Sequence, residues 1–381
     1  MRVVISAGGI FHVRHAAKAT WQAGCLARLI TTVRPDGDDG LDPRLITWLP
    51  LPEYLGQAIR RVPLLRNAIT WNWVKDNLFD RMAARHVPPC DVFHVWNNYG
   101  LYSMPRARRT GAKVLVDRAS VHPQIERGWL AGEYEKRGLR YPARHQALAT
   151  KQGREFESAD AILVPSSLVY DSMVAAGVPR AKLIKLLLGT APVQEPQPVR
   201  DGSITRVLFV GTVSFRKGVP YLLDAVHPWH GSSLELIFVG PIDEDVRRLL
   251  AAQRGLLRLI PATSQTALAS YYASASMLVL PSVADGFGMV VTEAMARGLP
   301  VIVSDHVGAA ELVHDGVDGF VVPYANAAAL RERISFLHEH PAEREAMGRA
   351  ARAHVSAFTW RHYGDGLLAA YRQLMTPETP A

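Results

Sequence analysis

Short apolar runs alternate with longer stretches of helical periodicity along both halves of the chain. The runs are rich in valine, isoleucine and leucine, which is typical of strands buried on both faces of a parallel sheet. In the first half we predict strands over residues 2–6, 27–32, 92–95, 113–117 and 161–164. In the second half we predict them over 206–210, 234–239, 277–280, 301–303 and 320–322. This alternation predicts an α/β chain with two Rossmann-like, doubly wound domains.

The segment TAPVQEPQPVRDGS, residues 190–203, combines prolines with polar residues, a composition that stops regular structure. We therefore predict a first domain at 1–190, a linker at 191–203 and a second domain at 204–358. Domains commonly run to about 100 to 200 residues, so a chain of 381 residues is long enough for two.

Helical patterns follow the last predicted strand, over 326–339, 342–356 and 360–375. The last pattern places Leu367, Tyr371 and Leu374 at helical spacing. We expect residues 359–381 to form a helix that packs back toward the first domain.

Composition and charge narrow the possible partners. The chain is 48% hydrophobic and 20% charged, with a net charge of +8, which indicates a globular protein with a preference for anionic ligands. Cys25 and Cys90 are too few for a zinc cluster or a disulfide framework. The first apolar run is too short for a signal peptide, and no segment has the apolar length of a membrane helix. We expect a cytoplasmic protein.

Ligands of open α/β sheets bind beyond the carboxyl ends of the strands, so the loops that follow strands are where chemistry is expected. These loops cover residues 7–12, 96–100, 118–122, 211–218, 240–243 and 281–288.

One such loop, in DGFGMVVTEAMARGLPVI (285–302), leads into a helix and carries Asp285 and Glu293, eight positions apart. Gly286 and Gly288 permit close approach of the backbone to a ligand, and the helix start offers unpaired N–H groups with roughly half a positive charge. This combination predicts an anion site that suits a diphosphate.

A second loop, GTVSFRKG, follows the strand at 206–210 and carries Gly211, Arg216 and Lys217. The two cations would face an anionic leaving group from the side opposite the helix start at 288. The alternative interpretation is a solvated basic turn.

Together, residues 206–226 and 278–323 resemble the second domain of family-four retaining glycosyltransferases, which have the GT-B fold and use a nucleotide-sugar donor. EFESADAILVPSS, residues 155–167, resembles the segment that precedes the linker in that family. The resemblance is dense over 206–323, and it is weaker but continuous over the first half.

The resemblance implies roles for individual residues. Arg216 and Lys217 match positions that neutralise the donor diphosphate, Glu293 matches the residue that binds the ribose hydroxyls, and Asp285 matches a carboxylate near the donor sugar. Asp285 is shorter than the glutamate usual there, which leaves the donor sugar open. The implied donor-binding set is completed by Gly211, Gly286, Phe287, Gly288, Met289 and Val290.

In the first half, His122 in DRASVHP resembles the family's histidine beside the donor sugar, so it joins Asp285, Arg216 and Lys217 as a catalytic candidate. Gly8 and Gly9 resemble the glycine loop that approaches the diphosphate. His12 and Arg118 are acceptor-side candidates, although each also suits a structural role. These candidates come from four loops: 7–12, 118–122, 211–218 and 281–288.

Two acidic clusters, Asp36 to Asp39 and Asp243 to Asp245, could suggest a divalent metal. We interpret both as solvated loops, because Arg216 and Lys217 suffice to neutralise a diphosphate. We therefore expect neither a metal nor another cofactor.

Residues 60–86 mix basic side chains with Trp71, Trp73 and several aliphatic residues. A basic, tryptophan-bearing amphipathic helix can lie on an anionic membrane surface, but it can equally pack on the first domain with its basic face in water. Peripheral membrane contact would favour a lipid-linked acceptor.

The sequence thus predicts a retaining, metal-independent hexosyltransferase that moves a sugar from a UDP- or GDP-sugar to a saccharide or lipid-linked acceptor in cell-envelope or exopolysaccharide synthesis. The alternatives are a sugar-nucleotide epimerase of the same fold and a non-catalytic sugar-binding scaffold subunit. A dehydrogenase is disfavoured because no Gly-x-Gly-x-x-Gly follows the first strand. Nucleic-acid binding has only the net charge in its favour, and we expect none.

Overall fold

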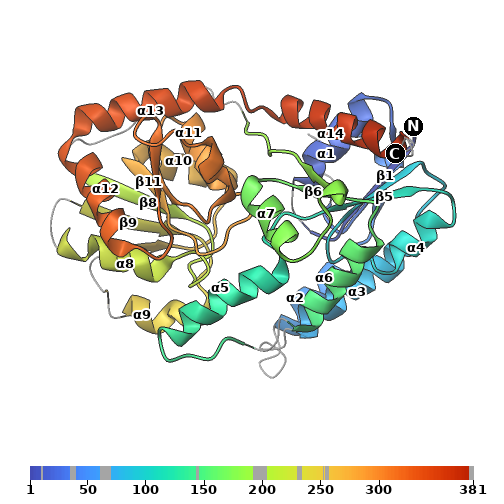
Figure 1. The fold of residues 1–381 in the computed structure, drawn as a ribbon, viewed down its shortest axis with the longest axis horizontal. Helices are drawn as coiled ribbons and strands as arrows, with labels where there is room; N and C mark the ends of the chain where they lie inside the picture. Colours follow the sequence, from blue (N-terminus) through green and yellow to red (C-terminus); the bar gives the residue numbers. More distant parts are fainter. Residues whose placement is uncertain are drawn as a thin grey trace.

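A computed structural model describes residues 1–9, 12–34, 40–60, 70–142, 146–191, 204–229, 234–251, 253 and 257–376. Within these residues the chain forms two parallel β-sheets, each covered by helices on both faces (Figure 1). This is the architecture that the alternation of strand and helix predicts, because parallel strands need a crossover segment between them. The α/β prediction is confirmed.

The first sheet has the strand order β3-β2-β1-β4-β5-β6-β7. Its strands are β1 Val3–Ala7, β2 Leu26–Thr31, β3 Ile46–Trp48, β4 Val92–Trp96, β5 Lys113–Asp117, β6 Ala161–Val164 and β7 Leu183–Lys185. Every neighbouring pair is parallel. The three-residue strands β3 and β7 lie at the two edges and were not predicted.

The second sheet has the order β10-β9-β8-β11-β12-β13. Its strands are β8 Thr205–Val210, β9 Leu234–Val239, β10 Leu257–Ile260, β11 Met277–Leu280, β12 Val301–Ser304 and β13 Gly319–Val322. These strands also pair in parallel. The edge strand β10 was not predicted, because its partly exposed residues give no buried apolar run.

The helices connect the strands and lie on both faces of each sheet. Those of the first half are α1 Val13–Gln22, α2 Leu51–Arg60, α3 Thr70–Ala84, α4 Ser103–Arg108, α5 Pro123–Glu135, α6 Gln146–Ser158 and α7 Ser167–Ala175. Those of the second half are α8 Val219–Val226, α9 Arg247–Ala251, α10 Gln265–Ser274, α11 Met289–Ala296, α12 Ala327–Glu339, α13 Pro341–Val355 and α14 Trp360–Met375. Short 3₁₀ turns lie at Pro43–Leu45, Arg180–Lys182, His227–Trp229, Glu244–Val246 (η6) and Gly308–Leu312 (η7).

The helix α14 lies against α1 of the first domain, so the chain crosses back after α13 (Figure 1). Gly364 makes this packing possible, because a Cβ there would lie 2.7 Å from the Cβ of Ala19. Tyr371 is fully buried, and its hydroxyl is hydrogen-bonded at 2.8 Å to Nδ1 of His94 in β4. Thr359 caps the helix by accepting a hydrogen bond from the His362 N–H.

Candidate active site

A cavity of about 440 Å³ lies between the two domains, at the carboxyl ends of strands from both sheets. This is the edge at which open α/β sheets bind their ligands. Arg118 follows β5 and Arg216 follows β8. The first domain contributes, among others, Asn98, Arg118, Ser120, Glu126, Arg127 and Gln152 to its lining, and the second contributes Ser214, Arg216, Asp243, Glu244 and Asp245.

Lys217 and Asp285 form an ion pair in which the Lys217 Nζ contacts the Asp285 Oδ2. Both side chains are 12% exposed, so the charges are largely removed from water. Although burial alone raises it, Lys217 and Arg216 hold the pKa of the Asp285 carboxyl below its usual value. Burial lowers the pKa of the Lys217 ammonium, against the opposing effect of Asp285. The structure thus brings together the two loops that carry the predicted catalytic pair.

Arg216 links these two loops through hydrogen bonds. Its Nη1 donates to the carbonyl of Ala284 at 2.8 Å, and its own carbonyl accepts from the N–H groups of Val283 and Ala284. Arg216 also lines the interdomain cavity. Because a guanidinium has five N–H donors, the bond to Ala284 leaves donors for a ligand.

Glycines permit the close packing of this region. Gly288 has a φ of 82° and directly precedes α11, and as a glycine it has no side chain that could cap the helix. The first N–H groups of α11, at Met289 and Val290, therefore keep the free donors of a helix start. A Cβ on Gly286 would lie 2.1 Å from the carbonyl oxygen of Ala119, so the 281–288 loop touches the first domain there.

Glu293 lies in α11 and is partly buried. Tyr272 of α10 donates a hydrogen bond to its Oε2 at 3.0 Å, and burial raises the pKa of the carboxyl. The described residues that line the interdomain cavity do not include Lys217, Asp285 or Glu293. Lys217 follows β8, and Asp285 and Glu293 follow β11, so all three come after the two central strands of the second sheet. Arg216, next to Lys217 in the chain, lines the cavity.

His122 is the residue before α5, and its Nδ1 accepts a hydrogen bond from the Gln124 N–H at 3.3 Å. Its side chain is mostly buried, and burial, followed by the charge of Arg118, lowers its pKa to about 4. The imidazole is therefore neutral at pH 7. It faces a groove of about 830 Å³ that also touches Phe156 and Lys182 and adjoins the cavity through Pro123 and Arg127.

Arg118 supports the loop that follows β5. Its guanidinium donates to the carbonyls of Ser120 and Val121 and to the Asn97 side chain. The residue also lines the cavity, although it is 5% exposed. The structure thus gives Arg118 a positioning role and leaves it next to a possible ligand.

His12 requires a correction. Its side chain is 5% exposed, and its Nε2 lies 2.9 Å from an oxygen of Asp117. Its ring packs against Trp96 and Tyr363. A loop position at the edge of a sheet suggested an acceptor contact, but the side chain points into the core.

The packing of neighbouring aromatic rings requires a glycine at position 8. A Cβ on Gly8 would lie 2.6 Å from the Tyr99 ring and 2.9 Å from the Phe79 ring. Gly9 is partly exposed. The absence of a side chain at Gly8 is therefore required by the packing of these two rings.

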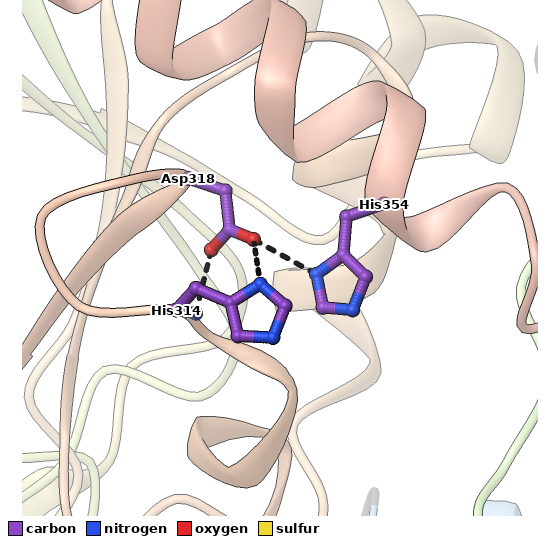
Figure 2. A group of neighbouring side chains, drawn as sticks. All are labelled: His314, Asp318 and His354. Atoms are coloured by element: carbon purple, nitrogen blue, oxygen red, sulfur yellow. Dashed lines mark hydrogen bonds and ion pairs between the residues drawn. The ribbon is translucent and has the colours of Figure 1, made fainter.

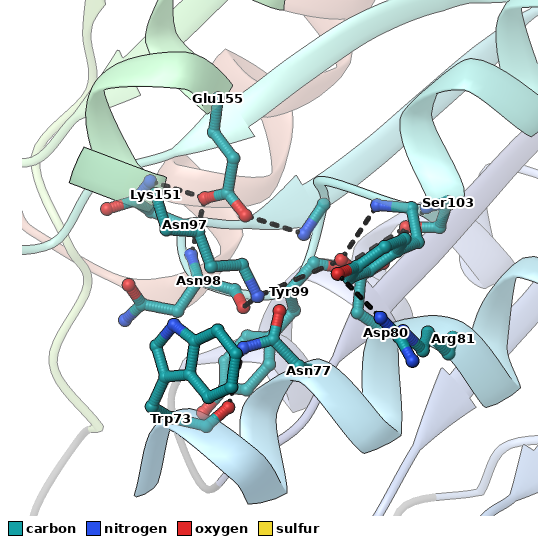
Figure 3. Close-up of polar contacts among 12 residues, drawn as sticks. Trp73, Asn77, Asp80, Arg81, Asn97, Asn98, Tyr99, Ser103, Lys151 and Glu155 are labelled. Carbon is teal, nitrogen blue, oxygen red and sulfur yellow. Dashed lines mark hydrogen bonds and ion pairs between the residues drawn. The ribbon is translucent and has the colours of Figure 1, made fainter. Parts of the chain in front are cut away.

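The structure adds residues that the sequence analysis did not select. Asn98, in the loop after β4, lines the cavity and has a positive φ of 87°. Figure 3 shows that α6 holds this loop: Glu155 accepts bonds from the N–H groups of Asn98 and Gly100, and Lys151 donates to the Asn98 carbonyl. The pair Lys151 and Glu155, four positions apart in the sequence, was the signal that could have pointed to these contacts.

The helix α5 joins the first domain to the second. The Tyr134 hydroxyl donates to Asp245 at 2.6 Å, and the Trp129 ring lies 4.0 Å from the ring of His306. Figure 1 shows α5 extending from beneath α7 toward α9 of the second domain. These contacts fix one wall of the cavity.

The acidic cluster Asp243 to Asp245 lies at the cavity, at the start of η6. Asp245 accepts from Tyr134, and Glu244 pairs with Arg247 at 2.7 Å. The Glu244 side chain is 89% exposed, in agreement with the predicted solvated loop, whereas Asp245 is partly buried and held by Tyr134. The other cluster, Asp36 to Asp39, lies outside the described residues.

The predicted 60–86 helix is α3 from Thr70 onward, while residues 61–69 and the side chain of Trp71 lie outside the described part. No helix in the described residues is both long and apolar enough to cross a membrane.

Comparison with known proteins shows what the second half of the chain is similar to. Residues 194–354 match the glycosyl transferases group 1 family. The chain is 37% identical over 124 residues to a D-inositol 3-phosphate glycosyltransferase from Thermobifida fusca (strain YX). That stretch covers 32% of this chain and only 28% of the relative.

Two solved structures share the whole fold. Sucrose-phosphate synthase from Thermosynechococcus elongatus has a TM-score of 0.75 at 22% identity, over 98% of this chain and 99% of that one. HepE from Anabaena, solved with UDP-glucose, has a TM-score of 0.68 at 14% identity, over 98% and 100%. At these identities the likeness concerns the fold. Residues 194–354 are thus similar to the glycosyl transferases group 1 family, and the two-domain architecture shared with these solved structures is the GT-B fold.

Proposed function

We propose that this chain is a retaining glycosyltransferase that moves a sugar from a nucleotide-sugar donor to a hydroxyl of a saccharide or lipid-linked saccharide, without a metal. The observation that carries the proposal is the convergence of Arg216, Lys217 and the start of α11 around Asp285, beside the interdomain cavity. The match of residues 194–354 to the glycosyl transferases group 1 family supports the same activity.

In this proposal the donor diphosphate lies between the 211–218 loop and the start of α11. Arg216 and Lys217 supply positive charge, and the N–H groups of Met289 and Val290 supply hydrogen-bond donors. Glu293 binds the ribose hydroxyls, and Asp285 lies near the sugar while holding the Lys217 ammonium in place. The acceptor enters from the side of Asn98 and Arg118, which line the cavity in the first domain.

The reaction breaks the bond between the sugar C1 and the β-phosphate oxygen and forms a bond from the acceptor oxygen to C1. The acceptor attacks from the face that the diphosphate leaves, and a departing phosphate oxygen takes the acceptor proton. The transition state has oxocarbenium character, so the main task of the protein is to stabilise charge on the leaving diphosphate. The neutral imidazole of His122 suits a hydrogen-bonding role near this region rather than a positive charge.

Nucleotide binding is the first test. We expect one of UDP, GDP, ADP or CMP to raise the melting temperature, because a ligand at about 100 times its Kd stabilises the native state by roughly 2.7 kcal/mol. HepE was solved with UDP-glucose, so UDP is the first choice. Glu293→Ala should abolish the shift, whereas Glu332→Ala, which removes a mostly exposed carboxylate from α12, should keep it.

Transfer is then followed with the matching nucleotide sugar and a panel of acceptors, and NMR of the product reports the anomeric configuration. An inverted product would contradict the retaining mechanism. Conversion of the donor to an epimer without any acceptor would support the epimerase alternative. If no nucleotide shifts the melting temperature, the non-catalytic sugar-binding alternative replaces the transferase.

We further propose that α2 and α3 touch a membrane surface, which would suit a lipid-linked acceptor in cell-envelope or exopolysaccharide synthesis at the inner face of the plasma membrane. The two helices are joined by a bond from Lys75 to Glu53 at 2.9 Å. Large apolar side chains are exposed on them and on the neighbouring β3: Trp48, Leu51, Tyr54, Leu55, Trp73 and Val74. Apolar side chains beside basic residues are typical of helices that bind anionic bilayers.

Flotation with phosphatidylcholine vesicles, with and without phosphatidylglycerol, tests this surface. We expect the protein to float with the anionic vesicles and the double variant Tyr54→Ala/Trp73→Ala to lose this binding. Leu259→Ala removes a similarly exposed apolar residue from the second domain and should change nothing. Equal recovery with both vesicle types, or equal binding by the double variant, would contradict the membrane contact.

A further inference from the structure

His314, Asp318 and His354 meet in the second domain, and none of them lines the interdomain cavity (Figure 2). His314 follows η7, Asp318 directly precedes β13, and His354 lies in the last turn of α13. The Nδ1 atoms of His314 and His354 lie 3.1 Å and 2.8 Å from the same oxygen, Oδ2 of Asp318. Three ligand-type atoms, two from the turn between η7 and β13 and one from α13, therefore converge on one point.

The carboxylate at the centre of this group is held in place. Asp318 is 1% exposed, and its other oxygen, Oδ1, accepts the N–H of His314 at 2.8 Å. A backbone bond to the second oxygen is the kind of outer contact that orients a ligating carboxylate. A buried carboxylate is stabilised by nearby positive charge, which a bound cation would supply.

The two imidazoles are arranged side by side. Their rings are stacked, with centroids 4.1 Å apart and planes at 16°, so both Nδ1 atoms face the carboxylate from the same side. The ligand atoms of all three residues lie within 4.8 Å of one another. Zinc binds imidazole nitrogen and carboxylate oxygen at about 2.0–2.2 Å, so an ion between these atoms needs only a small separation of the side chains.

The donor set selects the class of ion. Two imidazole nitrogens and one carboxylate oxygen suit zinc and its neighbours in the first transition series, whereas magnesium and calcium prefer oxygen ligands. The His314 side chain is 64% exposed, which gives an ion a route from solvent and room for a water as a further ligand.

We propose that His314, Asp318 and His354 form a binding site for a divalent transition-metal ion of the zinc class, fastening the end of α13 to the turn before β13. The segment after α13 is the crossover to the first domain. The ring of Phe358 contacts the ring of His354, and the Phe358 carbonyl accepts the N–H of Thr190 from the end of the first domain. The ion thus stabilises the base of the crossover and takes no part in the transfer.

Metal binding to the full chain tests the site. Protein without an affinity tag is treated with EDTA, freed of the chelator and titrated calorimetrically with ZnCl₂. CoCl₂ is added in parallel to record the visible absorption of inner-sphere cobalt. We expect one saturable site and a higher melting temperature with Zn²⁺, but no binding heat with MgCl₂.

Variants assign the ligands. His314→Ala and His354→Ala should each weaken Zn²⁺ binding by about 10- to 100-fold or more, the loss known for supporting residues of metal sites, and should remove the cobalt bands. His362→Ala, which removes an exposed histidine outside the cluster, should bind as the parent does. Circular dichroism of the exposed-site variant His314→Ala checks its fold. Unchanged binding in His314→Ala, or weak binding that His362→Ala reduces equally, would overturn the proposal.

Discussion

Lys217→Ala is expected to lower turnover about a hundredfold, because removing one donor that stabilises transition-state charge typically costs about 2.7–4 kcal/mol. In the proposed mechanism the Lys217 ammonium neutralises the diphosphate as it leaves. The Asp285 carboxylate holds that ammonium in place before the donor binds. Steady-state kinetics with the nucleotide sugar identified by the binding screen measure the effect.

The variant also leaves the largely buried Asp285 carboxylate without its partner, so a structural loss must be separated from a catalytic one. Calorimetric affinities for the nucleoside diphosphate and for the nucleoside make this distinction. A diphosphate role predicts that Lys217→Ala weakens binding of the diphosphate and leaves the nucleoside unchanged. Lys113→Ala removes an exposed lysine and should match the parent. Full activity, or equal weakening of both ligands, would reject the role.

Glu155→Gln is expected to lower the free energy of unfolding by about 1–3 kcal/mol, the cost of leaving a buried donor unsatisfied. Oε2 of Glu155 accepts bonds from the side chain of Asn97 and the N–H of Asn98, and Oε1 accepts the N–H of Gly100 (Figure 3). An amide offers one oxygen and one NH₂ group, so at least one donor must then face another donor. Urea unfolding followed by circular dichroism measures the loss.

Glu155 is also expected to make the free energy of unfolding depend on pH. Burial raises the pKa of Glu155 to about 7, against the opposing effect of Lys151. Between the ordinary pKa of a glutamate and this value, the folded chain holds a proton that the unfolded chain has released. The contribution of Glu155 to stability therefore falls as the pH rises toward 7, and Glu155→Gln should remove this slope.

Glu157→Gln, an exposed change two positions along the same helix, is the control and should match the parent in both respects. Because Glu155 holds the loop of Asn98, the Glu155→Gln variant should also raise the KM for the acceptor. A Glu155→Gln variant as stable as Glu157→Gln would show that the loop does not depend on this carboxylate.

The extent of prediction from sequence differs between elements. Strands such as β1 and β4 are buried along their whole length, so an apolar run marks them clearly. The edge strands β3, β7 and β10 were missed because their residues are only partly buried, which weakens the apolar signal. The helix α14 was predicted with its observed limits, since a capping threonine marks its start.

The site residues of the two domains also differ in how far the sequence could predict them. In the second domain the candidate residues lie in two short segments, 211–218 and 285–293, where glycines and charges form patterns that can be recognised locally. In the first domain, loop position identified His12 and Arg118 but not the direction of their side chains. The His12 side chain contacts Asp117 in the core, and the Arg118 guanidinium donates to the carbonyl of Ser120 in its own loop.

The sequence by itself determined the α/β class, the division into two doubly wound halves and the basic and acidic loops of the second half, because these depend on periodicity and on residues close together in the chain. Only the tertiary structure decided that Lys217 pairs with Asp285, that α6 holds the Asn98 loop, that α5 reaches Asp245 and that His314 and His354 share Asp318. Such contacts join segments far apart in sequence, and their geometry is fixed by how the sheets and helices pack, which no local pattern records.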